Sequence, residues 1–116
     1  MVTEIDRGEL KQKLDHPKKF VLVETLPADH FQRLHLPGAI NIPSNQIQSR
    51  ASDLLPDKDA EIIVYCGGPE CHVSEDAARE LSAMGYSKVR RYVGGKQDWV
   101  EARLPVVRDN QPIAAA

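Results

Sequence analysis

Short apolar runs separated by polar segments dominate the pattern of hydrophobic and polar positions along this chain. The clearest run, Ile-Ile-Val-Tyr-Cys at residues 62–66, follows Glu61 and is ended by a Gly-Gly-Pro sequence. Compact apolar runs of this length, bounded by turn residues, are typical of buried strands. The strands predicted in this way cover residues 20–24, 39–42, 61–66 and 88–93.

Between these runs the chain carries signals for the starts and stops of helices. Asp6 followed by Glu9 is a possible capping box. Ser74, with two acidic residues after it, can satisfy the free amides at the start of another helix, which Gly85 would end. The predicted helices cover residues 6–14, 28–34, 44–51, 74–84 and 97–102.

The alternation of strands and helices predicts an α/β fold with a mostly parallel sheet in three α/β/α layers. No repeat, low-complexity segment or linker interrupts the pattern. We therefore expect one domain over residues 1–107, followed by a C-terminal tail over residues 108–116. Ligands of such sheets bind beyond the carboxyl ends of the strands, where we expect the loop at residues 66–73.

Composition and charge narrow the function classes. The 116 residues are 41% hydrophobic and 28% charged, with a formal net charge of −2, so no basic field favours nucleic acid. No apolar run approaches the roughly 20 residues of a membrane span. The N-terminus lacks the basic and apolar regions of a signal peptide, so a cytoplasmic location is expected. Two cysteines are too few for a disulfide scaffold, and in that compartment a close pair points to chemistry.

The loop that begins at Cys66 combines features that activate a thiol. A cysteine at the end of a strand leads through Gly67 and Gly68 toward a helix start. Backbone amides of such a loop, with the positive end of the helix, stabilise a thiolate and hold anions. Cys66 is therefore a candidate nucleophile. The alternative is that Cys66 is a small, buried and inert residue at the end of a core strand.

Two further residues of the loop leave alternatives open. Cys71 is either a second thiol that resolves an oxidised or sulfur-loaded Cys66 as a disulfide, or an ordinary loop residue. His72 either donates to an anion or is simply solvated. Zinc bound by Cys66, Cys71 and His72 is a further option. The spacing is not that of a standard zinc finger and no fourth ligand is obvious, so we predict no metal.

In its segments at residues 34–43, 64–66, 74–86 and 93–105, the chain resembles the single-domain rhodanese-like family, and the resemblance extends from about residue 3 to residue 107. The segment Leu-His-Leu-Pro-Gly-Ala-Ile-Asn-Ile-Pro at residues 34–43 is similar to the family's "GHIPGAINIP". The other residues that carry the resemblance are Val64-Tyr65-Cys66, Ser74, Ala77-Ala78, Leu81, Gly85-Tyr86, Val93-Gly94-Gly95, Trp99 and Leu104-Pro105.

This resemblance implies a rhodanese-like fold and a catalytic cysteine at Cys66. In the family that cysteine takes a sulfane sulfur from a donor such as thiosulfate, forms a persulfide, and passes the sulfur to a nucleophile such as a thiol. The partners implied are a small persulfide or thiosulfate as donor and a thiol acceptor, on a small molecule or a partner protein, with no cofactor. Loop amides hold the donor and the persulfide, and here these belong to Gly67, Gly68, Glu70, Cys71 and His72.

The chain departs from the family pattern in three ways. The family often has Asp-x-Arg after its second strand, but Glu24-Thr25-Leu26 stands here without the arginine. The loop is two residues longer than usual. It holds no Arg or Lys but does hold Glu70, whose charge disfavours a dianionic donor. These differences argue against efficient use of thiosulfate and favour a persulfide donor.

Three hypotheses follow for function. The first is a sulfurtransferase or persulfide carrier with Cys66 as nucleophile. The second is a non-catalytic binding module on the same scaffold, because a fold does not determine a function. The third is a redox switch through a Cys66–Cys71 disulfide. A phosphatase or arsenate reductase is disfavoured, since His72 stands where related phosphatases have an arginine that grips phosphate with two parallel bonds.

Overall fold

The computed structural model describes residues 2–16, 19–109 and 111–113, and it has one central sheet of five parallel strands. The strand order is β1-β5-β4-β2-β3. The strands are β1 (Val2–Ile5), β2 (Phe20–Glu24), β3 (Ile40–Asn41), β4 (Glu61–Tyr65) and β5 (Lys88–Tyr92).

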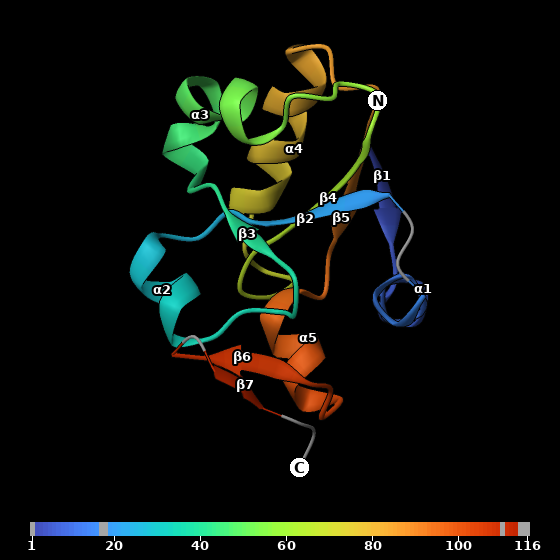
Figure 1. Ribbon diagram of the computed structural model, residues 1–116, viewed down its shortest axis with the longest axis vertical. Coiled ribbons are helices and arrows are strands. Elements are labelled where there is room, and N and C mark those ends of the chain that lie inside the picture. The colour runs from blue at the N-terminus through green and yellow to red at the C-terminus, as the bar shows by residue number, and fades with distance from the viewer. Residues whose placement is uncertain (1, 17–18, 110, 114–116) are drawn as a thin grey trace.

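Helices cover both faces of this sheet, which gives the three layers seen in Figure 1. Helices α3 (Ile47–Leu54) and α4 (Val73–Ala83) lie on one side, and α1 (Arg7–Asp15), α2 (Ala28–Arg33) and α5 (Gly95–Glu101) lie on the other. A short 3-10 helix, η1 (Ser44–Gln46), precedes α3. The prediction of a three-layer α/β fold with a mostly parallel sheet is confirmed.

The core is divided by β4, whose side chains alternate between the two faces. Ile62 and Val64 pack toward α3 and α4, while Ile63 and Tyr65 pack in the cluster that contains Trp99 of α5. All four strand side chains are completely buried. A strand buried on both faces needs a continuous apolar run, and this explains why the pattern at residues 62–66 was so clear.

Each predicted strand is present to within one residue at either end, but β1 was not predicted. Its sequence is Val-Thr-Glu-Ile, and only Ile5 is buried. β1 forms the edge of the sheet and pairs with β5, with Val2 opposite Val89 and Ile5 opposite Tyr92. An edge strand of this kind tolerates polar residues, so its sequence carries little of the apolar signal.

A small hairpin lies where the C-terminal tail was predicted to begin. Strands β6 (Val106–Arg108) and β7 (Gln111–Ile113) pair antiparallel, and Val107 exchanges two backbone hydrogen bonds of 2.9 Å with His35. The hairpin spans the predicted boundary between residues 107 and 108. That boundary stays a prediction, and residues 110 and 114–116 lie outside the described part of the chain.

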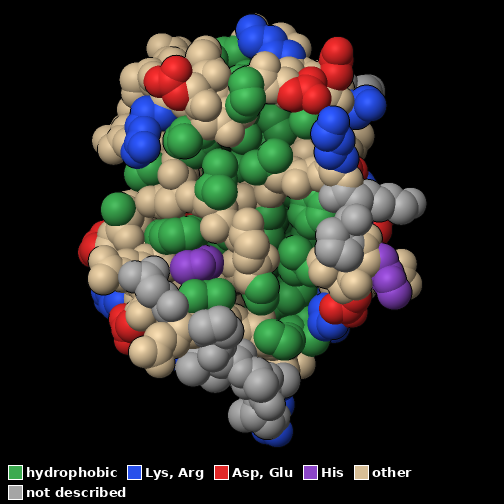
Figure 2. Space-filling model, in the orientation of Figure 1, with side chains coloured by type: hydrophobic (Ala, Val, Ile, Leu, Met, Phe, Trp, Pro, Cys, Tyr) green, Lys and Arg blue, Asp and Glu red, His purple; other side chains and the backbone are tan. Residues whose placement is uncertain are grey.

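The molecular surface shows no concentration of one charge on the face drawn in Figure 2. Lys and Arg side chains there are interspersed with Asp and Glu toward the rim, and hydrophobic side chains occupy much of the middle. No helix in the described residues is long and apolar enough to cross a membrane.

A buried ion pair joins the end of β2 to the start of α5. The carboxylate of Glu24 is fully buried, with Lys96 Nζ 2.9 Å from Oε2 and the Tyr65 hydroxyl donating to Oε1 at 2.9 Å. Burial raises the pKa of Glu24, and the bonds to Lys96 and Tyr65 oppose that rise. Lys96 Nζ also donates to the carbonyl of His30 at 2.9 Å. A cation from α5 thus neutralises the buried carboxylate at the end of β2.

We expect Lys96→Met to destabilise the protein by about 3 kcal/mol at neutral pH, because it leaves a buried carboxylate without its counter-charge. The loss should shrink at mildly acidic pH. Without Lys96 the folded-state pKa of Glu24 lies further above its unfolded value, so stability falls as pH rises through that window. Urea unfolding at both pH values measures the effect.

Lys11→Met is the matched control, because Lys11 pairs with Asp15 on the exposed side of α1. Loss of an exposed pair should cost less than about 1 kcal/mol at either pH. Equal losses for the two variants, or a loss for Lys96→Met that does not change with pH, would contradict this account of the buried pair.

Candidate functional site

Cys66 lies directly after the central strand β4, at the carboxyl edge of the sheet. It is 1% exposed. From there residues 66–72 run to the start of α4, with Gly68 buried, Cys71 partly exposed, and Pro69, Glu70 and His72 exposed. The loop therefore occupies the position where parallel α/β sheets bind their ligands, as the sequence indicated.

The first turn of α5 holds the beginning of this loop by its backbone. Lys96 N–H donates to the carbonyl of Cys66 at 3.0 Å, and Gln97 N–H donates to the carbonyl of Gly67 at 2.8 Å. These are donors that a helix start cannot use within the helix. Because N–H and C=O of a trans peptide point in opposite directions, the amides of Gly67 and Gly68 face away from α5.

Gly95 makes this close approach of α5 to the loop possible. Its φ is +64°, and a Cβ there would lie 2.6 Å from the carbonyl oxygen of Cys66. Any side chain would therefore push the loop away from the helix. The structure thus explains the glycine at the second position of the Gly94-Gly95 pair, which carries part of the resemblance.

The far end of the loop turns back on itself. Cys71 N–H donates to the carbonyl of Gly68 at 3.0 Å. This bond engages one of the five amides expected to hold a donor, so in this state the Cys71 amide is occupied within the loop. The turn also directs the Cys71 side chain toward Cys66, and the two cysteines form a disulfide with a Cα–Cα distance of 6.4 Å.

A buried arginine that sequence reasoning missed joins both ends of the loop. Arg91 of β5 is 9% exposed, and its Nη2 donates to the carbonyl of Cys71 at 2.9 Å. Its Nε donates to Ser74 Oγ at 3.0 Å, and that oxygen lies 3.3 Å from Cys66 Sγ. The loop itself carries no cation, but the neighbouring strand places a guanidinium beside it.

The parity of β5 could have revealed Arg91. Successive side chains of a strand alternate between faces, so Arg91 shares the face of the buried Val89, whereas Arg90 lies on the opposite face. Arg90 there meets Glu9, with 2.6 Å between Nη1 and Oε2. The sequence contained part of this signal, an arginine two residues from an apolar valine within a predicted strand, and the structure adds that this strand lies beside β4.

The expected capping role of Ser74 is wrong. Helix α4 begins at Val73 with His72 as its first flanking residue, and no side-chain hydrogen bond caps it. Ser74 is instead 1% exposed inside the first turn and uses its hydroxyl to link Arg91 to the Cys66 sulfur. A serine near a helix start satisfies the sequence pattern in either position, so only the tertiary contact separates the two roles.

His72 and Glu70 are both exposed to solvent. The His72 side chain is exposed, and its Nδ1 lies 3.2 Å from Glu75 Oε2. The hydrogen bond from His72, together with nearby Arg79, lowers the pKa of Glu75. Within the described residues, no group of three or more His, Cys, Asp or Glu side chains comes together as metal ligands.

An uncharged groove of about 420 Å³ lies next to the loop, between the ends of β2 and β3 and the start of α4. Thr25, which follows β2, is fully buried and bonds the carbonyl of Tyr65 through both N–H and Oγ1. The lining residues of the groove are Thr25, Leu26, Pro27, Ala28, Pro43, Ser44, Asn45, Gln46 and Val73.

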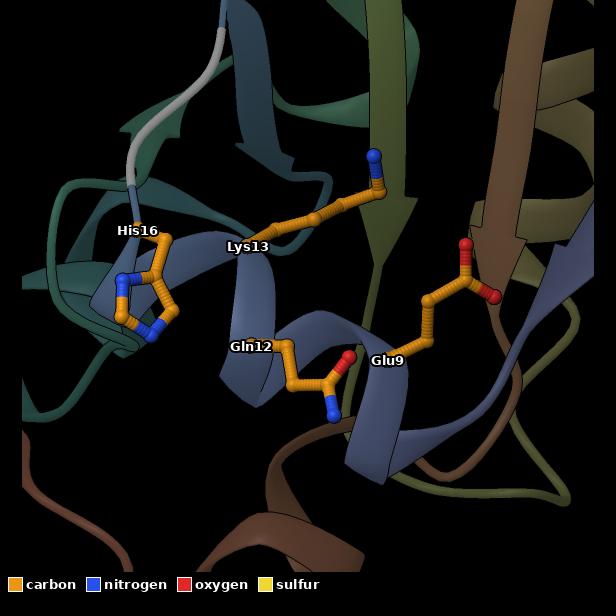
Figure 3. A pocket seen from close by; sticks show the side chains of 4 residues that line it. All are labelled: Glu9, Gln12, Lys13 and His16. Carbon is orange, nitrogen blue, oxygen red and sulfur yellow. The ribbon is translucent and has the colours of Figure 1, made fainter.

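A second hollow, of about 400 Å³, lies on α1 and is separate from this loop. Figure 3 shows Glu9, Gln12, Lys13 and His16 around it, with Lys13 reaching toward β4 and Glu9 toward β5. Lys13 pairs with Glu61 at 2.8 Å, and Glu9 pairs with Arg90. Lys13 and Glu9 therefore join α1 to β4 and β5.

Comparisons with known proteins match most of this chain to one family. The family model described as the rhodanese-like domain matches residues 6–102. A protein of Allochromatium vinosum named a sulfurtransferase is 32% identical over 108 residues, which cover 92% of this chain and 96% of that one. The thiosulfate sulfurtransferase PspE of Escherichia coli is 37% identical over 70 residues, or 60% of this chain and 64% of that one.

Solved structures agree with the sequence comparisons. The solution structure of a rhodanese-like domain from Anabaena superposes with a TM-score of 0.84 at 25% identity, covering 100% of this chain and 86% of that one. Several curated relatives are much longer. This chain spans 43%, 51% and 23% of the first three.

We expect Arg91→Met to make Cys66 harder to ionise, because it removes the cation beside the sulfur. In the reduced protein carrying Cys71→Ser, the midpoint of the pH profile for alkylation of Cys66 should rise by about one pH unit. Arg91→Lys, which keeps the charge but not the two-armed geometry, should give a smaller rise. The rate of iodoacetamide reaction at a series of pH values measures both.

Arg79→Met is the matched control for this prediction. Arg79 lies on the exposed side of α4 and pairs with Glu75, so its removal should leave the alkylation profile in place. An unchanged midpoint in a folded Arg91→Met protein would show that the guanidinium serves only the packing of the loop.

Proposed function

The chain belongs to the rhodanese-like family, and from this premise we propose that it moves sulfane sulfur through a persulfide on Cys66. The observation that carries the proposal is the placement of Cys66: a buried sulfur at the end of the central strand, linked through Ser74 to the guanidinium of Arg91. Relatives named as sulfurtransferases support sulfur transfer as the general reaction.

The proposed reaction has two displacement steps. The Cys66 thiolate attacks the outer sulfur of the donor; a new sulfur–sulfur bond forms, and the donor leaves with the electron pair of the bond that breaks. The leaving group is sulfite when the donor is thiosulfate, and a thiolate when the donor is a persulfide. An acceptor thiolate then attacks the outer sulfur of the Cys66 persulfide and regenerates the Cys66 thiolate.

The surroundings of Cys66 favour the anionic forms that the two displacement steps need. Arg91 supplies positive charge from β5, and the amides of Gly67 and Gly68 face away from the helix that holds their carbonyls. Glu70 stays on the exposed side of the loop and opposes the approach of a dianion. We therefore propose a persulfide, on a small thiol or a partner protein, as the preferred donor and a thiol as the acceptor.

The disulfide favours a second candidate function, a redox switch. Cys66 cannot attack a donor while it is bonded to Cys71, so oxidation would turn sulfur transfer off and reduction would restore it. A thiol–disulfide switch of this kind requires a reducing compartment, which is the cytoplasmic location expected from the sequence.

Sulfur loading should depend on Cys66 alone. We expect reduced Cys71→Ser protein to gain one sulfur atom from glutathione persulfide or from thiosulfate, and Cys66→Ser protein to gain none. Each variant keeps a single thiol, so each is the control for the other. Intact mass under non-reducing conditions measures the gain, and dithiothreitol should remove it.

Two outcomes would redirect the assignment. Loading of Cys66→Ser would move the persulfide to Cys71. No loading of the folded Cys71→Ser protein by either donor would remove the transferase and favour a binding module on this scaffold.

Oxidation should block loading if the disulfide acts as a switch. We expect peroxide to join Cys66 to Cys71 in the reduced wild-type protein, to prevent loading by thiosulfate, and to be reversed by a dithiol. Non-reducing peptide mapping identifies the bond. Two free thiols after peroxide treatment would eliminate the switch.

A further inference from the structure

The two cysteine residues differ in how far they are open to solvent. Cys66 is 1% exposed, whereas Cys71 is partly exposed. The disulfide between them shows that Cys71 Sγ reaches Cys66 Sγ within the folded chain. Cys71 is therefore a thiol of the same chain that can reach the inner sulfur of a Cys66 persulfide.

We propose that Cys71 is the internal acceptor of the sulfur-loaded protein and that the chain thereby releases sulfide. This inference rests on the proposed function, because it starts from the Cys66 persulfide. The Cys71 thiolate attacks Cys66 Sγ, the bond between the two cysteine sulfurs forms, and the bond from Cys66 Sγ to the outer sulfur breaks. The outer sulfur leaves with that electron pair as hydrosulfide.

The electrons balance within this step. The sulfane sulfur is reduced to sulfide, and the two cysteines are oxidised to the disulfide that the structure contains. A second co-reactant is needed only to restore the thiols, and its chemical class is a dithiol reductant. The complete cycle is a dithiol-dependent reduction of a persulfide or thiosulfate donor to sulfide.

Arg91 holds the geometry that this step requires. Its Nη2 binds the Cys71 carbonyl, and its Nε binds the Ser74 hydroxyl beside Cys66 Sγ. One guanidinium thus fixes the backbone of the attacking residue relative to the sulfur that is attacked. The hydrogen bond from Cys71 N–H to the Gly68 carbonyl closes a turn that also directs Cys71 toward Cys66.

The reductive half of the cycle has a preferred direction for the same reason. An external dithiol meets the partly exposed Cys71 more readily than the buried Cys66. Attack on Cys71 Sγ expels Cys66 as a thiolate next to Ser74 and Arg91, and a stabilised thiolate leaves faster. Reduction therefore returns Cys66 to its nucleophilic form first.

A single-turnover experiment tests the inference. Reduced wild-type and Cys71→Ser proteins, freed of reductant and kept without oxygen, are incubated with thiosulfate and, separately, with glutathione persulfide. Released sulfide and intact mass are then measured. We expect wild type to release one sulfide per chain and to end as the Cys66–Cys71 disulfide. Cys71→Ser should retain the sulfur and lose the sulfide release.

The controls separate this step from background chemistry and from loss of fold. Cys66→Ser with each donor measures sulfide that arises without loading. Cys71→Ala repeats the Cys71→Ser arm with a different side chain, and circular dichroism establishes that both remain folded.

The outcomes distinguish this inference from the proposed function. Wild type that keeps the sulfur on Cys66 and releases no sulfide would overturn the internal acceptor and leave the transferase intact. Peptide mapping that finds the sulfur on Cys71 would also overturn it, since the outer rather than the inner sulfur would have been attacked. Failure of the folded Cys71→Ser protein to load with either donor would refute the persulfide itself.

Discussion

The contacts of Lys96 are the interaction on which the arrangement of this site depends. Its N–H holds the carbonyl of Cys66, while its ammonium neutralises the buried Glu24 and donates to the carbonyl of His30. One residue at the start of α5 therefore connects the loop, β2 and α2. Both the position of the loop and the tolerance of a buried carboxylate follow from where α5 lies.

The chemistry of the site depends on a second cation placed on the other side of the sheet. Arg91 reaches the loop from the α4 side and binds the far end of it, whereas Lys96 holds the near end from the α5 side. The loop is thus fastened at both ends by neighbouring elements. This leaves the two sulfurs facing each other, with Cys66 deep and Cys71 toward solvent.

The departures from the family pattern acquire a physical explanation in this arrangement. No arginine follows Glu24, and its carboxylate is paired with a lysine from α5, while the loop without Lys or Arg has an arginine of β5 beside it. A local motif shows only the charges within the loop after Cys66 and directly after β2. A counter-ion distant in sequence can satisfy the same carboxylate or sulfur, and no local motif records it.

The sequence by itself determined the layered α/β fold, four of the five strands of its sheet and the position of Cys66 at the carboxyl edge. Continuous apolar runs report burial on both faces, and Gly-Gly-Pro reports the end of a strand. Only the tertiary structure decided the polar edge strand β1, the hairpin of β6 and β7, the role of Ser74 and the reach of Cys71 to Cys66. Those features depend on contacts between residues far apart in the chain, whereas hydrophobic periodicity records only how each segment meets the core.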